Sequence, residues 1–266
     1  MKIQDDKYYT PIDLANRCID KVIETIGFEN ITDVIEPSCG DGSFFHHDKL
    51  KPSLGIDICP EILSDVTVVT ADFLEIDIPY FKGRLTLGNP PYGNKMNLAQ
   101  KFFKKAIEIG DYVAFILPIS QLNNTQSLFE FDLVYSEDLG IVEFSGKKLH
   151  CCFNIYKRPE HGLNKKKSGR LKQVSFSRND SKGFDDFKYD VRMCAWGDSA
   201  GRIIGEDEHY AAEYKIKVAD DCEFRNEIID FLKTFDWRSY MKCIAMRKIQ
   251  IFHIVNLLRE NFKDLT

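Results

Sequence analysis

The chain has 266 residues, of which 44% are hydrophobic and 29% are charged. This composition excludes disordered, collagen-like and low-complexity architectures, because it supplies ample apolar material for a packed core. No stretch approaches the roughly 20 apolar residues of a membrane-spanning helix, and the first residues are too polar for a signal peptide. We therefore expect a soluble, cytoplasmic protein with no membrane association. The eight cysteines lack a C-x-x-C pair, which predicts reduced, mostly buried thiols and no metal site.

The charges are distributed unevenly along the chain. The net charge is −5, yet Lys147–Lys182 holds eleven Lys and Arg against only Glu160 and Asp180, a local balance of +9. A basic stripe on an acidic body is typical of a face that contacts phosphates. The predicted phosphate contacts are Lys165, Lys166, Lys167 and Arg170. A merely solvated loop around the three lysines is the alternative interpretation.

Short strands and helices alternate over the first 160 residues. Helical spacing predicts a first helix over Pro11–Ile26, capped by Thr10 and stopped by Gly27. Short apolar runs followed by turn residues predict strands at 33–36, 54–58, 66–70, 84–87 and 112–117. A helix over 98–109 and an edge hairpin of 141–144 with 149–156 complete this part. The pattern indicates an α/β protein with a Rossmann-like, mostly parallel, doubly wound sheet.

The character of the sequence changes near residue 160, where we place a domain boundary. Residues 161–266 are predicted to form a small mixed α+β part, with strands near 191–196 and 215–218. Helices are expected over 223–233 and 238–259, the second broken near Ala245. This part is a candidate DNA-contacting or reduced target-recognition region.

Chemistry-bearing residues follow three successive predicted strands. Ligands of open α/β sheets bind beyond the carboxyl ends of the strands. The glycine-rich loop Glu36–Gly42 follows the first strand, and Asp57, a potential acceptor for ribose hydroxyls, follows the second. Asp72 and Phe73 follow the third and pair an acceptor with an aromatic plate, which suits an adenine. Each alone is more often a cap or core residue, but together they predict a nucleoside cofactor.

The strongest signal is Asn89-Pro90-Pro91-Tyr92, after the fourth strand. The two prolines stiffen the backbone and remove two N–H donors, which leaves carbonyl acceptors. An amino group can donate to the Asn89 side chain and the Pro90 carbonyl, which stabilises the positive charge that develops when its nitrogen attacks an electrophile. Tyr92 offers a stacking face to the planar group that bears the amine. A structural Pro-Pro turn is the alternative, and it leaves Asn89 and Tyr92 unexplained.

Taken in order, these motifs resemble the gamma class of DNA adenine-N6 methyltransferases, which use S-adenosylmethionine on a Rossmann-like fold. The resemblance covers about residues 5–160 and includes the segment Tyr8-Tyr9-Thr10-Pro11. It implies that the catalytic motif Asn89, Pro90, Pro91 and Tyr92 grips the substrate adenine. The implied cofactor contacts are Thr10 and Pro11 at the methionine carboxylate, Glu36, Pro37, Cys39, Gly40 and Gly42 around the methionine, Asp57 at the ribose, and Asp72 and Phe73 at the adenine.

The family also places an aromatic residue of a late strand against the second face of the base. Phe153 is the candidate here and Tyr156 the competitor, with a core position as the alternative for both. The implied reaction is an in-line methyl transfer to a base flipped out of the duplex, which needs positioning but no metal.

Similar sites methylate adenine in RNA or a glutamine amide in proteins, and a non-catalytic nucleic-acid-binding subunit is a further alternative. The Tyr-Thr-Pro segment and the loop after the first strand favour DNA. The region after residue 160 is short for a target-recognition domain, so a partner could supply specificity, and a cognate restriction nuclease is a candidate partner.

Overall fold

The computed structural model describes residues 8–62, 66–244, 248–263 and 265. The chain forms two compact units, Met1–Lys166 and Lys167–Thr266. The division lies at Lys166 rather than near residue 160, because residues after the last strand still bond to the first unit: the Asn164 backbone N–H donates to the Glu130 carbonyl over 2.9 Å. In the described residues, no helix is long and apolar enough to cross a membrane.

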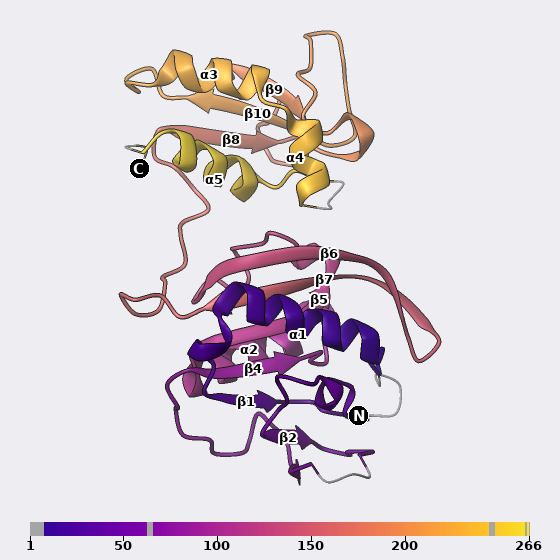
Figure 1. The fold of residues 1–266 in the computed structure, drawn as a ribbon. Coiled ribbons are helices and arrows are strands. Elements are labelled where there is room, and N and C mark those ends of the chain that lie inside the picture. The colour runs from indigo at the N-terminus through magenta and orange to yellow at the C-terminus, as the bar shows by residue number, and fades with distance from the viewer. Residues whose placement is uncertain (1–7, 63–65, 245–247, 264, 266) are drawn as a thin grey trace. The chain divides into compact units, whose positions relative to one another are not determined.

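The first unit is built on a seven-stranded sheet in the order β3-β2-β1-β4-β5-β7-β6 (Figure 1). Its strands are β1 (Asp33–Glu36), β2 (Leu54–Asp57), β3 (Val68–Thr70), β4 (Arg84–Gly88), β5 (Tyr112–Pro118), β6 (Asp132–Phe144) and β7 (Lys147–Lys157). Strands β1 to β5 pair in parallel, whereas β7 is antiparallel to both β5 and β6. The Rossmann-like, mostly parallel sheet with an edge hairpin is therefore confirmed.

Helices cover both faces of this sheet. Helix α1 (Ile12–Ile26) ends at Gly27, whose φ of 86° suits glycine, and buries its apolar side with Phe153 of β7 in one cluster. Helix α2 (Asn97–Ile109) lies on the other face, where Phe103 meets Tyr156 with 4.9 Å between ring centroids. Figure 1 shows α1 in front of the sheet and α2 behind it. Short 3₁₀ turns complete the unit: η2 (Phe28–Asn30), η3 (Ser43–His46), η4 (Asn94–Met96) and η5 (Ile119–Gln121).

The edge hairpin is longer and its turn tighter than the sequence pattern predicts. Strands β6 and β7 pair from Asp132 with Lys157 to Phe144 with Lys147. Only Ser145 and Gly146 separate them, with φ angles of 48° and 82°. Two successive positive φ angles are the mark of a type I′ turn, which matches the twist of the flanking strands. The turn therefore holds Lys147 at a defined position opposite Phe144.

The second unit is a three-stranded antiparallel sheet in the order β8-β10-β9, packed against three helices. The strands are β8 (Val174–Arg178), β9 (Val191–Cys194) and β10 (Glu213–Val218). The helices are α3 (Arg225–Thr234), α4 (Trp237–Cys243) and α5 (Ile251–Asn261), with the 3₁₀ turn η6 over Gly197–Ser199. The mixed α+β prediction describes these elements, but it missed β8. The predicted break at Ala245 lies outside the described residues.

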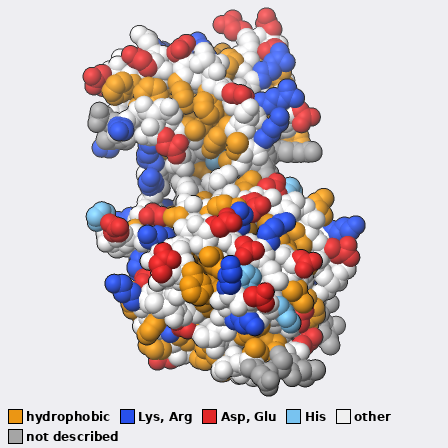
Figure 2. Space-filling model, in the orientation of Figure 1, with side chains coloured by type: hydrophobic (Ala, Val, Ile, Leu, Met, Phe, Trp, Pro, Cys, Tyr) orange, Lys and Arg blue, Asp and Glu red, His pale blue; other side chains and the backbone are white. Residues whose placement is uncertain are grey.

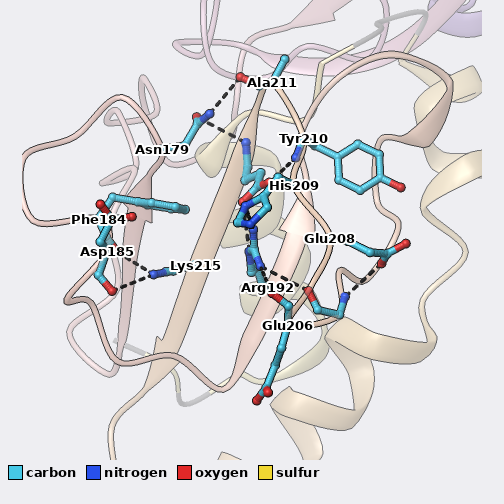
Figure 3. A network of polar contacts seen from close by, with 12 residues as sticks. Asn179, Phe184, Asp185, Arg192, Glu206, Glu208, His209, Tyr210, Ala211 and Lys215 are labelled. Carbon is cyan, nitrogen blue, oxygen red and sulfur yellow. Dashed lines mark hydrogen bonds and ion pairs between the residues drawn. The ribbon is translucent and has the colours of Figure 1, made fainter.

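The second sheet has one apolar and one polar face. Tyr214 and Ile216 of β10 join the helices in the core, so Glu213 and Lys215, which alternate with them, face the other way. Buried Arg192 of β9 pairs with Glu213 over 2.7 Å and also donates to the Gly205 carbonyl (Figure 3). Lys215 donates to the carbonyl of Phe184 over 2.6 Å. These contacts tie the loops around Phe184 and Gly205 to the sheet.

Candidate active site

One cavity of about 330 Å³ lies in the first unit, at the carboxyl ends of β1, β2 and β4. Residues from both predicted groups line it: Pro37, Gly40, Asp57, Asp72 and Phe73 from the cofactor group, and Asn89, Pro90, Pro91 and Tyr92 from the catalytic group. Tyr8, Tyr9, Ser38, Ile58, Cys59, Ala71, Leu74, Leu98 and Phe102 complete the wall. The sheet thus brings two groups of residues, separated in sequence, to a single hollow.

The glycine-rich loop is held against the end of β2 by Asp57. The Gly40 N–H donates to Asp57 Oδ2 over 2.9 Å, and the Cys59 N–H donates to Oδ1 over 2.8 Å. Glycine suits position 40, because its φ is 50° and a Cβ there would lie only 3.3 Å from the Tyr9 ring. Because each carboxylate oxygen accepts more than one hydrogen bond, Asp57 keeps acceptor capacity toward the cavity for two hydroxyl groups.

Glu36 is a buried carboxyl group beside this loop. It is 2% exposed, and its Oε2 has no hydrogen-bond partner among the described residues. Burial, and then the charges of Asp41 and Asp57, raise the pKa of Glu36 well above its usual value. An uncompensated carboxyl next to two carboxylates suits a cationic ligand. A sulfonium or ammonium group would meet this requirement, so the residues present fit the predicted cofactor.

Of the other predicted cofactor residues, some line the cavity and some are buried in the core of the first unit. Asp72 is exposed at the cavity, and its Oδ1 accepts from the Leu74 N–H over 2.9 Å. Phe73 touches the cavity but is only 1% exposed, because its ring packs on Phe102 with 5.2 Å between centroids. Cys39 is also buried, and burial together with the Glu36 charge raises its pKa to about 12, so the thiol stays neutral.

Asn89 forms hydrogen bonds to Thr10, Tyr92 and Ser38. Its Nδ2 donates to Thr10 Oγ1 over 3.3 Å, and its Oδ1 accepts from the Tyr92 hydroxyl over 3.0 Å. Burial raises the pKa of Tyr92 well above its usual value, so the hydroxyl remains a donor. Ser38 of the glycine-rich loop donates to the Asn89 main-chain carbonyl over 3.2 Å. The two halves of the cavity are therefore linked directly.

The Thr10 side chain accepts a hydrogen bond from Asn89 and does not cap helix α1. The N-cap of α1 is Pro11, and no side chain caps that helix, so the predicted capping role of Thr10 is wrong. Thr10 is buried and Pro11 is exposed, and neither belongs to the cavity wall. Gly42 has a left-handed backbone with a φ of 83°, and it is also not part of the cavity wall.

The two predicted base-stacking residues lie in the core. Phe153 and Tyr156 are both 0% exposed. They point to opposite faces of the sheet, Phe153 into the α1 cluster and Tyr156 against Phe103. Neither ring offers a face to a base, because each is enclosed by its own side of the core. Tyr8 also lines the cavity. The sequence motifs indicate it only as the first residue of the segment Tyr8-Tyr9-Thr10-Pro11.

The four predicted phosphate contacts, Lys165, Lys166, Lys167 and Arg170, are all exposed. They lie in an irregular segment that spans the division between the two units. On the visible face of the protein, basic and acidic side chains are interspersed and do not gather into one basic area (Figure 2). Their contact with phosphates remains a prediction.

Neither a protein-family model nor a curated protein matches this sequence. Solved structures do match its fold. A proposed RNA methyltransferase from Pyrococcus horikoshii has a TM-score of 0.47 at 15% identity, over 59% of this chain and 89% of its own.

A proposed class I S-adenosylmethionine-dependent methyltransferase from Listeria monocytogenes has a TM-score of 0.49 at 11% identity, over 62% of this chain and 65% of its own. The M protein of the type I restriction enzyme EcoKI has a TM-score of 0.43 at 15% identity, over 66% of this chain and 49% of its own. Likeness at this level does not identify a substrate.

Proposed function

We propose that this protein transfers a methyl group from S-adenosylmethionine to the N6 amino group of adenine in DNA. The observation that carries the proposal is the single cavity that Asp57 and Asp72 share with Asn89, Pro90 and Tyr92. A donor group and an acceptor amine held in one hollow satisfy the geometric requirement of a direct transfer. The gamma-class order of motifs supports adenine as the acceptor.

S-adenosylmethionine, when bound, supplies a methyl group on a positively charged sulfur. Asp57 and Asp72 are the acceptors available for its ribose and adenine. A cationic group beside the buried carboxyl of Glu36 would favour the ionised form of that carboxyl. The loop from Pro37 to Gly40 holds its place through Ser38, which bonds to Asn89.

The Asn89 loop orients the substrate amine. Asn89 Oδ1 has one hydrogen bond from Tyr92 and a second lone pair for an incoming N–H. The Pro90 carbonyl is the second acceptor of the proposal. Two acceptors hold the amino group so that its lone pair is directed away from them, and they stabilise the positive charge that develops on nitrogen.

The test offers tritiated S-adenosylmethionine to the full chain with adenine-unmethylated duplex DNA, the same DNA as single strands, total RNA and a protein extract. We expect label in DNA, released as N6-methyladenosine nucleoside after digestion. Label in RNA would make RNA the substrate in place of DNA, and label on glutamine would make a protein the substrate. Label in none of the four would contradict the enzymatic proposal and favour a non-catalytic nucleic-acid-binding subunit.

A further inference from the structure

Two tyrosines from distant parts of the chain face each other at the substrate side of the cavity. Tyr8 and Tyr92 both line it. Their rings are nearly parallel, with an interplanar angle of 21° and 6.4 Å between centroids. Stacked bases lie about 3.4 Å apart, so a planar base between two aromatic rings needs a spacing of about 7 Å. The observed centroid distance is shorter than this requirement by about half an ångström, so the two rings must separate slightly to admit a base.

The β6–β7 turn holds Tyr8 in this position. The Phe144 ring meets the Tyr8 ring edge to face, at 6.3 Å between centroids and 88° between planes. The Tyr9 N–H donates to Ser145 Oγ over 3.3 Å, and Asn89 Nδ2 lies 3.5 Å from the Tyr8 carbonyl oxygen. Contacts from two separate elements thus orient the second ring.

The same turn brings a cation to Tyr8. Lys147 Nζ lies 4.9 Å from the centroid of the Tyr8 ring, on an exposed side chain. Among the described residues of the cavity wall, the charged side chains are the carboxylates Asp57 and Asp72. Lys147 is a cation placed beside the aromatic part of this wall.

We propose that Tyr8 and Lys147 form a nucleotide subsite, in which Tyr8 stacks on the base face opposite Tyr92 and Lys147 contacts the phosphate of the same nucleotide. This inference rests on the proposed function and narrows its substrate class to a nucleotide. A glutamine amide is too small to stack fully between Tyr8 and Tyr92, and it carries no phosphate for Lys147 to contact. Tyr8 thus takes the role that was predicted for Phe153, which lies in the core.

The test measures binding of adenosine and of adenosine 5′-monophosphate by calorimetry, with saturating S-adenosylhomocysteine to fill the cofactor part of the cavity. Tyr8→Ala should weaken both probes equally, by about 5- to 150-fold, the loss expected for one base–aromatic contact. Tyr8→Phe keeps the ring and should restore binding. Lys147→Ala should weaken the monophosphate alone, and Lys147→Arg should restore it.

Phe28→Ala and Lys82→Ala are matched controls, since both residues are exposed and neither belongs to the cavity wall. They should bind both probes as the unaltered chain does. The subsite is overturned if Tyr8→Ala leaves both affinities unchanged, or if it weakens S-adenosylhomocysteine instead. Its phosphate half is overturned if Lys147→Ala affects adenosine as much as the monophosphate. If the unaltered chain transfers no methyl group to nucleic acid, the proposed function is refuted instead, whatever these affinities are.

Discussion

Asn89 engages both ends of its side-chain amide, which makes it sensitive to substitution in a specific way. Asn89→Ala removes the acceptor proposed for the substrate amine and also the partner of the Tyr92 hydroxyl at 3.0 Å. We expect kcat to fall by about 10²- to 10³-fold, the usual cost of one lost transition-state hydrogen bond. The Kd for S-adenosylmethionine should change little, because the cofactor acceptors are Asp57 and Asp72. Steady-state kinetics with calorimetry measures both.

Asn94→Ala is the matched control for this change, since Asn94 is exposed in the 3₁₀ turn after the catalytic motif. It should leave kcat unaltered. An Asn89→Ala chain with normal turnover would remove Asn89 from the chemistry.

The raised pKa of Glu36 predicts that the stability of the folded chain depends on pH. Burial raises its pKa in the folded chain, so between the ordinary glutamate pKa of about 4.3 and the raised value the folded state holds more protons than the unfolded state. Stability contributed by the neutral form is therefore present at low pH and is lost as pH rises through this window. Glu36→Gln cannot ionise and should lose less stability between about pH 5 and pH 8.

Urea unfolding followed by circular dichroism at both pH values measures the difference for Glu36. Glu75→Gln is the control, because Glu75 is exposed and directly follows the cavity residue Leu74. Equal pH dependence in the Glu36→Gln variant and the unaltered chain would contradict a protonated Glu36.

At the scale of elements, the second sheet depends on a buried ion pair between β9 and β10. Arg192 and Glu213 have side chains only 5% and 2% exposed. Arg192→Ala leaves Glu213 buried without its partner and should destabilise the unit by about 3–5 kcal/mol. Replacing both, as Arg192→Met with Glu213→Leu, should recover most of this loss. Both tryptophans, Trp196 and Trp237, lie in this unit, so their fluorescence follows its unfolding in urea.

The exposed pair Arg202–Glu208, with side chains 57% and 39% exposed, is the matched control for the buried pair. Arg202→Ala should cost at most about 1 kcal/mol. Equal losses at the buried and exposed pairs would mean that burial does not set the energy of the Arg192 contact.

The sequence predicted elements well where periodicity and turn residues agree. The strand over Asp33–Glu36 has the predicted bounds, and the first helix begins one residue later than expected. Strand β8 was missed although Val174–Arg178 alternates apolar and polar residues as a strand does, because it lies within the basic stretch. Phe153 could not be assigned from sequence, because the side to which a strand residue points depends on pairing register.

The candidate site shows the same division between local and long-range information. The catalytic motif and Asp57 can be found from the sequence because the motif directly follows β4 and Asp57 ends β2. Tyr8 is not readable in this way, since its position depends on Phe144 and Ser145, more than a hundred residues away in the sequence. Contacts of this length follow from the complete sheet order and cannot be inferred from local spacing.

At the scale of the whole molecule, the exposed segment between the two units carries the remaining prediction. Replacing Lys165, Lys166 and Lys167 by Ala should flatten the salt dependence of DNA affinity, because each lost phosphate contact lowers the slope of log K against log salt by about 0.9. Three contacts would lower it by about 2.7, which fluorescence anisotropy with a labelled duplex can measure over a salt series.

A change in net charge alone must be separated from this loss of contacts. The triple variant Lys49→Ala, Lys51→Ala and Lys82→Ala removes the same charge from exposed positions of the first unit. If long-range attraction explains the binding, both triple variants should weaken it alike. If the segment touches phosphates, only the change at 165–167 should alter the slope, because counterion release requires local neutralisation of the backbone. An unchanged slope in that variant would leave these lysines as solvated charges and return the search for DNA contacts to the β6–β7 turn.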